Sequence, residues 1–359
     1  MTPRTRKYIA QAGSFVLAGL LLYLSLRGVN VSEVGLALRE ARYVWLLPLM
    51  IVTLLSHLLR AWRWQMLLEA LPAEQRPGRV SLWEAFAALM IGYMVNYAAP
   101  RAGEFVRAAH LARRTRVPFS SVLGTVTVER LLDVLVLGLA LVSVAVLLVD
   151  QMAIVQTLFI DPIRSRVSPS FGLILAALAL LLAGLLLVLT RRIMSPRGGW
   201  SRRLQAPFIA FRAGLMTVVR SKRPLALTLA TGAMWACYLL MAYLPFVILG
   251  MHETFSLSLL DAWSVMILGA LGVALPSPGG TGSYHYITIE TLVHLYGVAR
   301  SPAASYAILA HAGQMILYIA LGIALLLIQG TGFGELREEA RMSSEVPEKG
   351  VSTEAGTRI

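Results

Sequence analysis

The chain has 359 residues, of which 57% are apolar and only 14% charged, and its mean hydropathy is +0.70. A soluble domain carries about 25% charged residues, so this composition excludes a cytosolic enzyme, a disordered chain and a secreted disulfide scaffold. The net charge of +13 fits the excess of Lys and Arg in cytoplasmic loops of membrane proteins, and we expect no nucleic-acid partner. The single cysteine, Cys237, lies in an apolar run and forms no internal disulfide.

Six apolar segments are long enough to cross about 30 Å of hydrocarbon as helices. They are 8–26, 43–62, 119–149, 171–190, 225–249 and 303–328. No small-x-small cleavage site follows the first segment, so we expect it to remain as an uncleaved helix. Two more apolar stretches, about 82–99 and 259–275, are followed by Gly/Pro breaks and short helical segments.

The distribution of Lys and Arg predicts how these segments are threaded. Basic residues are concentrated in 60–81, 101–118 and 191–224, which places all three in the cytoplasm. For the first two to share a side, residues 82–106 must enter the membrane and return, with a bend near 99–103. The same argument predicts a second re-entrant hairpin, 259–298, which opens to the outside and bends near 276–282.

This threading places 25 of the 32 Lys and Arg residues inside, six outside and one, Arg130, within a span. Both termini are then cytoplasmic. The halves 8–149 and 171–328 have the same order of span, span, hairpin and span, entered from opposite sides. Inverted repeats with broken helices are typical of transporters, whose substrate site lies near the midplane. A plain bundle of eight spans is the alternative.

We therefore predict an all-α polytopic membrane protein with about six full spans and two re-entrant helical hairpins in an inverted-topology repeat. Residues 1–328 form a single transmembrane domain, and 329–359 form a polar tail that we expect to be disordered and cytoplasmic.

The first break places Arg101, Glu104 and Arg107 three residues apart, on nearly one helix face. Arginine can bind phosphate in a bidentate manner, and Glu104 could hold either arginine while the site is empty. Asn96, just before the break, can cap freed backbone groups. These four residues are candidate substrate ligands. The other interpretation is a solvated basic segment at the lipid headgroups.

The second break, 276–282, contains two prolines and three glycines. A backbone break inside a bilayer needs protein or water partners, so this run marks a cavity wall or a packed interior. Gly279, Gly280 and Gly282 allow close approach of a ligand. Free N–H groups where a helix begins near Ser283 favour an anion such as phosphate. An extramembrane loop between two spans is the alternative.

Glu129, Arg130 and Asp133 lie in an otherwise apolar segment. Each charge in mid-membrane costs roughly 2.5–3.5 kcal/mol, which argues for a charge network or proton coupling rather than an idle triad. An ion pair with Arg130 would leave one carboxylate for a proton, for Arg101 or for a cationic headgroup. A purely structural ion pair is the alternative.

Other polar residues are given structural interpretations, and we expect neither a metal nor a cofactor. The spacing of His285, His294 and His311 matches no metal motif. We interpret one further group as an interfacial belt of aromatic and basic side chains: His57, Arg60, Trp62, Arg63 and Trp64.

Three stretches, taken together, resemble a known family. They read Asn96-Tyr-Ala-Ala-Pro-Arg-Ala-Gly-Glu-Phe-Val-Arg107, Val126-Thr-Val-Glu-Arg-Leu-Leu-Asp133 and Pro276-Ser-Pro-Gly-Gly-Thr-Gly-Ser283. In this order they are similar to the signatures of the lysylphosphatidylglycerol synthase transmembrane (flippase-like) family, over about residues 8–328. The resemblance implies a bacterial or archaeal cytoplasmic-membrane protein with re-entrant hairpins. In two-domain members this region carries an aminoacylated phospholipid to the outer leaflet.

The sequence departs from those members at two places. Only about thirty polar residues follow 328, so we expect no soluble aminoacyl-transferase domain. Tyr284 and His285 also follow the glycines where the family pattern has a charged residue, so lysylphosphatidylglycerol is not assumed as substrate.

From these features we predict a lipid flippase or lipid-linked transporter, not an enzyme, that moves an anionic or aminoacylated phospholipid between leaflets. The partner is membrane phospholipid, with a lipid-modifying enzyme as a further candidate partner. Two alternatives are a membrane-embedded transferase with Glu129 or Asp133 as general base, and a non-transporting accessory subunit.

Overall fold

The structure is a computed structural model that describes residues 3–75, 79–149, 156, 199–275 and 277–330. Every regular element in these ranges is a helix. Four helical stretches are long and apolar enough to cross a membrane: Tyr43–Glu69, Phe119–Leu147, Pro224–Ile248 and Arg300–Ile328. A fifth candidate is the pair Ala12–Leu26 and Val31–Arg39, whose axes meet at 86°. The chain is thus a helical multi-pass membrane protein.

These candidate spans overlap five of the six predicted segments. The sixth, 171–190, and the tail after 330 lie outside the described residues. The first segment, 8–26, lies within one helix, Pro3–Leu26, and the 86° bend follows it, before Val31.

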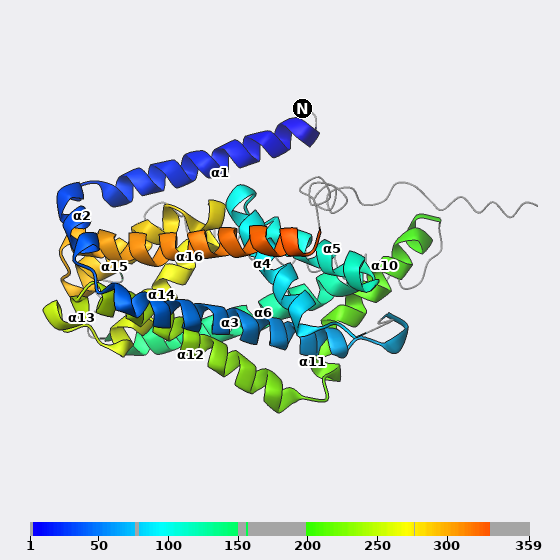
Figure 1. Cartoon of the computed structure of the whole chain (residues 1–359). Helices are drawn as coiled ribbons and strands as arrows, with labels where there is room; N and C mark the ends of the chain where they lie inside the picture. Colours follow the sequence, from blue (N-terminus) through cyan, green and yellow to red (C-terminus); the bar gives the residue numbers. More distant parts are fainter. Residues whose placement is uncertain (1–2, 76–78, 150–155, 157–198, 276, 331–359) are drawn as a thin grey trace, which may run out of the picture.

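The first half of the chain contains α1 (Pro3–Leu26), α2 (Val31–Arg39), η1 (Tyr43–Trp45), α3 (Leu46–Glu69), η2 (Ala73–Gln75), α4 (Leu82–Ala98), α5 (Gly103–Thr115) and α6 (Phe119–Leu147). The second half contains α10 (Gly199–Leu215), α11 (Thr217–Arg220), α12 (Pro224–Ile248), α13 (Met251–Thr254), α14 (Leu259–Ala274), η5 (Pro278–Gly280), α15 (Ser283–Tyr296) and α16 (Arg300–Ile328). Figure 1 shows α3, α12 and α16 running lengthwise through the bundle, with α2 and α13 at one end and α10 and α11 at the other.

At the end marked by α2 and α13, loops from both halves meet. The Asn30 backbone N–H donates to the Ser301 hydroxyl at 3.2 Å. Arg42 forms an exposed bidentate pair with Glu253, and its side-chain hydrogen bond lowers the pKa of that carboxyl. Segments before α3, after α12 and before α16 therefore share this end, as the loop charges predict.

At the opposite end, the loops that follow α3 lie beside those that precede α6 and α12. The Ser121 hydroxyl donates to the Gln75 side chain at 2.9 Å. Arg223 lies 3.7 Å from Glu69. The chain between α3 and α6 therefore enters the bundle and returns to the same end.

That chain is the hairpin of α4 and α5, and α14 with α15 forms a second hairpin that opens at the other end. The four helices have 17, 13, 16 and 14 residues, fewer than the roughly 20 that a full span needs. Glycines let each pair pack closely: a Cβ on Gly92 would lie 2.8 Å from the Gly103 carbonyl oxygen, and one on Gly272 would lie 2.7 Å from that of Ser283.

The bends of the two hairpins meet inside the bundle. The α4 helix ends at Ala98 and α14 at Ala274, so both breaks fall where the sequence predicts them. The Arg101 guanidinium donates to the Ala274 carbonyl oxygen. Gly279, at φ 58, lies so close to the Tyr97 ring that a Cβ there would be 2.2 Å from a ring carbon.

Candidate functional site

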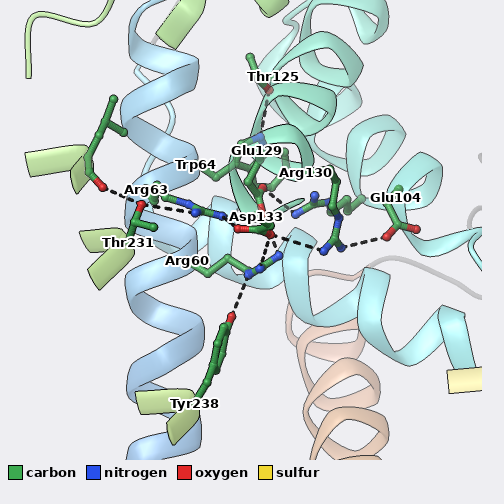
Figure 2. A network of polar contacts seen from close by, with 12 residues as sticks. Arg60, Arg63, Trp64, Glu104, Thr125, Glu129, Arg130, Asp133, Thr231 and Tyr238 are labelled. Atoms are coloured by element: carbon green, nitrogen blue, oxygen red, sulfur yellow. Dashed lines mark hydrogen bonds and ion pairs between the residues drawn. The ribbon is translucent and has the colours of Figure 1, made fainter. Parts of the chain in front are cut away.

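The centre of the site is a set of ion pairs between α3 and α6 (Figure 2). Arg60 donates to Glu129 Oε1 at 2.8 Å and to Asp133 Oδ2 at 2.5 Å. Arg63 donates to Asp133 Oδ1 at 2.6 Å and lies 3.6 Å from Glu129 Oε1. Because the arginines are three residues apart and the carboxylates four, each pair faces the other helix from a single side.

The α5 helix adds two more charges to these pairs. Arg107 donates to Glu129 Oε2 at 3.0 Å, and its guanidinium lies 4.9 Å from the centre of the Trp64 ring. Glu104 accepts from Arg130 at 2.9 Å, and Arg130 is 3.7 Å from Asp133. The helix that begins at the first break is thereby tied to α6.

We call these seven residues the buried charge network: Arg60, Arg63, Glu104, Arg107, Glu129, Arg130 and Asp133. Its centre is inaccessible, since the side chains of Arg63 and Glu129 are 0% exposed and that of Arg107 is 2% exposed. Four arginines face three carboxylates, so the network has one positive charge in excess. Buried charges require partners, and this excess favours an anion nearby.

A cavity of about 780 Å³ lies against the network, between the two hairpins. Its polar wall is formed by side chains from both halves of the chain: Arg60, Tyr93, Asn96, Arg101, Glu104, Arg130, Asp133, Tyr238, His311 and Gln314. Aliphatic residues form other parts of the wall, among them Leu137, Met266 and Val273. The wall of the cavity is thus amphipathic.

The cavity brings together several of the sequence-derived candidates. Its wall includes Asn96, Arg101, Glu104, Arg130, Asp133, Gly279 and Gly280. Asn96 also caps the second helix of its hairpin, because the Gly103 N–H donates to its side-chain oxygen at 2.8 Å.

Four other candidates lie away from the cavity wall. Arg107 and Glu129 are buried behind it in the buried charge network. Gly282 packs on α1, where a Cβ would lie 2.3 Å from the Ala18 carbonyl oxygen. The Ser283 hydroxyl is 2.7 Å from that of Ser277. Ser283 therefore belongs to the packing of the second break.

The interfacial belt predicted around residue 60 is wrong for four of its five residues. Trp62 is 37% exposed, but the others are at most 5% exposed: His57, Arg60, Arg63 and Trp64. The reason is that α3 continues to Glu69, so these residues lie inside the helix and not in the following loop. Arg60 and Arg63 are residues of the candidate site that the sequence interpretation missed. Their spacing of three residues, which would place both on one face of a helix if the apolar segment continued, is the sequence signal that points to them.

Two expectations about the first break and α6 are also corrected. Arg101 adopts a left-handed backbone (φ 62) before α5, so it does not share a helix face with Glu104, and Glu104 pairs with Arg130 instead of Arg101 or Arg107. No carboxylate on α6 is left over, because arginines from α3 and α5 take the oxygens of Glu129 and Asp133. The excess charge is positive.

The histidines near the second break are packed against its backbone and against aromatic rings. His311 Nε2 is 3.0 Å from the Gly279 carbonyl oxygen, and the His285 and His311 rings are 4.8 Å apart. Within the described ranges, no group of three or more His, Cys, Asp or Glu is arranged to hold a metal ion.

Comparison with known proteins gives one match. Residues 11–322 match the family described as the lysylphosphatidylglycerol synthase TM region. The chain belongs to this family. Neither the curated proteins nor the solved structures contain a match. Membership supports a membrane-lipid-related function, and the matched region contains both hairpins and the whole buried charge network.

Proposed function

We propose that this protein moves an anionic or aminoacylated phospholipid between the leaflets of the membrane, as a transporter and not as an enzyme. The observation that carries the proposal is the amphipathic cavity between the hairpins, whose charged wall adjoins a network with an excess positive charge. A lipid phosphate is complementary to such a wall, and arginine binds it with geometric specificity. The aliphatic wall suits the lipid's glycerol and upper acyl region.

The order and lengths of the helices support the proposed architecture of two inverted repeats with re-entrant hairpins. Helices α3, α4, α5 and α6 have 24, 17, 13 and 29 residues, and α12, α14, α15 and α16 have 25, 16, 14 and 29. Both hairpins begin with a capping box, Ser81 with Glu84 and Ser258 with Asp261. The cavity where the two breaks meet is the substrate position expected for such a repeat.

The loop charges support placement in a bacterial or archaeal cytoplasmic membrane, with the end that carries α10 and α11 and both termini in the cytoplasm. Under this topology the α4–α5 hairpin opens to the cytoplasm and the α14–α15 hairpin to the outside. A headgroup between the two breaks is then about midway between the leaflets. A lipid-modifying enzyme that supplies or consumes the lipid is a further proposed partner.

The test is leaflet exchange in liposomes. Purified protein is reconstituted with acyl-labelled phosphatidylglycerol, and the fraction of label reached by an external quencher is followed over time. We expect wild-type protein to accelerate exchange and Arg101→Ala to slow it about tenfold or more, because the variant loses a cationic group on the cavity wall. Arg220→Gln, an exposed substitution at the end of α11, is the matched control and should exchange at the wild-type rate. Absence of exchange for phosphatidylglycerol, phosphatidic acid and phosphatidylcholine alike would refute the proposal.

A further inference from the structure

We infer that the preferred headgroup is a phosphate monoester that carries two negative charges, on a lipid anchor. The inference rests on the proposed function and specifies its substrate class.

The complete site carries an excess of positive charge. The buried charge network has four arginines and three carboxylates, and the cavity wall adds Arg101 as a fifth arginine. The wall contributes no further carboxylate beyond Glu104 and Asp133. The described part of the site therefore has two positive charges in excess.

The excess positive charge is carried by arginines on the cavity wall and directly behind it. The Arg101 guanidinium contacts a backbone carbonyl oxygen, that of Ala274, and forms no ion pair with a carboxylate in the described part of the chain. Arg130 also lines the cavity, and its Nε is buried without a hydrogen-bond partner. Behind the wall, Arg107 has Nε and one terminal nitrogen buried without partners. Arg130 on the cavity wall and Arg107 behind it therefore have nitrogen donors without a hydrogen-bond partner.

Headgroups differ in how much negative charge they bring to this excess. A phosphate monoester carries about −1.5 to −2 at pH 7 and offers three acceptor oxygens, which neutralises the excess of two. A phosphodiester carries one charge and leaves one arginine unpaired, and a zwitterionic headgroup has no net charge to offer. A lysine ester adds cationic groups and would increase the excess. Arg60 and Asp133 on the cavity wall are only 6% and 16% exposed, so the charge difference between headgroups is screened less there than at an exposed surface.

The phosphate has two candidate sources, a lipid and a soluble molecule. A soluble phosphomonoester could satisfy the arginines equally well. The aliphatic residues that also line the cavity, including Leu137, Met266 and Val273, favour a headgroup attached to a lipid because an apolar chain can pack against them.

The experiment is a competition in the exchange assay. Labelled phosphatidylglycerol reports the rate, and unlabelled phosphatidic acid, phosphatidylglycerol and phosphatidylcholine compete at increasing mole fractions at pH 7.5. We expect phosphatidic acid to halve the rate at about a tenfold lower mole fraction than phosphatidylglycerol, and phosphatidylcholine to be the weakest competitor. Glycerol 3-phosphate, present on both sides, should not compete. Lipids retained by the purified protein, measured by native mass spectrometry, give the same comparison without transport.

Substitution of Arg101 makes the test specific to charge. Arg101→Gln reduces the excess to one, so the tenfold advantage of phosphatidic acid over phosphatidylglycerol should fall to about twofold or less, whereas Arg101→Lys and the control Arg220→Gln should retain it. Equal competition by the two lipids in wild-type protein, or an advantage unchanged in Arg101→Gln, would overturn the inference while leaving the proposed exchange function intact. Competition by glycerol 3-phosphate as strong as by phosphatidic acid would overturn its lipid part. Absence of exchange for every lipid would instead refute the proposed function. In that case the lipids retained by the purified protein would still test the preference for phosphatidic acid over phosphatidylglycerol.

Discussion

Glu129 is the residue whose replacement tests the buried charge network most directly. Its carboxylate is fully buried and lies 2.8 Å from Arg60, 3.0 Å from Arg107 and 3.6 Å from Arg63. Glu129→Gln is close to isosteric, so it keeps the side-chain volume, removes the charge and replaces one acceptor oxygen by an NH2 group. The excess positive charge of the network then rises from one to two, and Arg107 loses its carboxylate partner.

The size of the effect follows from the burial of these groups. Removing one partner of a buried ion pair costs about 3–5 kcal/mol, because the remaining charge has no compensation. For a chain of 359 residues that corresponds to a fall of about 4–7 °C in the apparent midpoint of thermal unfolding. Glu253→Gln is the matched control, because Glu253 is 59% exposed and its pair with Arg42 is accessible to water. That variant should melt at the wild-type temperature.

The assay is thermal unfolding of purified protein in detergent, followed by tryptophan fluorescence and by loss of the monodisperse chromatographic peak. A second variant separates charge from packing: Arg107→Gln combined with Glu129→Gln brings the excess back to one, so at least half of the lost stability should return. If Glu129→Gln melts at the wild-type temperature, or if the double variant loses as much stability as the two single variants together, the ion pairs do not stabilise the fold.

Two further predictions concern glycines at close contacts. Gly92→Ala places a Cβ 2.8 Å from the Gly103 carbonyl oxygen and should destabilise the protein by about 1–3 kcal/mol in the same melting assay, whereas Gly138→Ala, on α6 with open space around it, should be neutral or stabilising. Gly279→Ala and Gly297→Ala each force alanine into a left-handed backbone at a cost of about 1–2 kcal/mol. Only at Gly279 does the new Cβ meet the Tyr97 ring, so Gly279→Ala should slow lipid exchange and Gly297→Ala should not. Equal exchange rates for the two variants would contradict the close contact between the hairpins.

Much of the fold could be predicted because hydrocarbon imposes a strong constraint on sequence. Apolar length located α6, α12 and α16 to within a few residues, and it located α3 except for its continuation to Glu69 through Arg60 and Arg63. Loop charge identified the loops that share an end, and the Gly/Pro breaks located both bends. The 86° bend between α1 and α2 could not be read in this way, because it depends on how those helices pack on the second hairpin and on α16.

The sequence predicts several residues of the candidate site but not which residues form ion pairs with one another. Charges in an apolar helix identified Glu129, Arg130 and Asp133. Their ion-pair partners lie on α3, about 70 residues earlier in the chain, and on α5, about 25 residues earlier. Periodicity relates residues on one helix and contains no information about which helix lies opposite. Arg60 and Arg63 were read as loop charges for this reason, since an arginine near the end of an apolar run has the same appearance whether it faces headgroups or a carboxylate.

The burial of arginines in the buried charge network also bears on the topology that the loop charges predict. The positive-inside rule applies to residues whose charge faces water or headgroups, so an arginine buried against a carboxylate carries no information about orientation. Arg60, Arg63 and Arg107 were counted on the cytoplasmic side, and all three are buried in the buried charge network. Without them, 22 basic residues stand inside against six outside. The asymmetry survives because the cytoplasmic excess is carried mostly by 191–224 and by the exposed end of α5, neither of which contributes to the buried charge network.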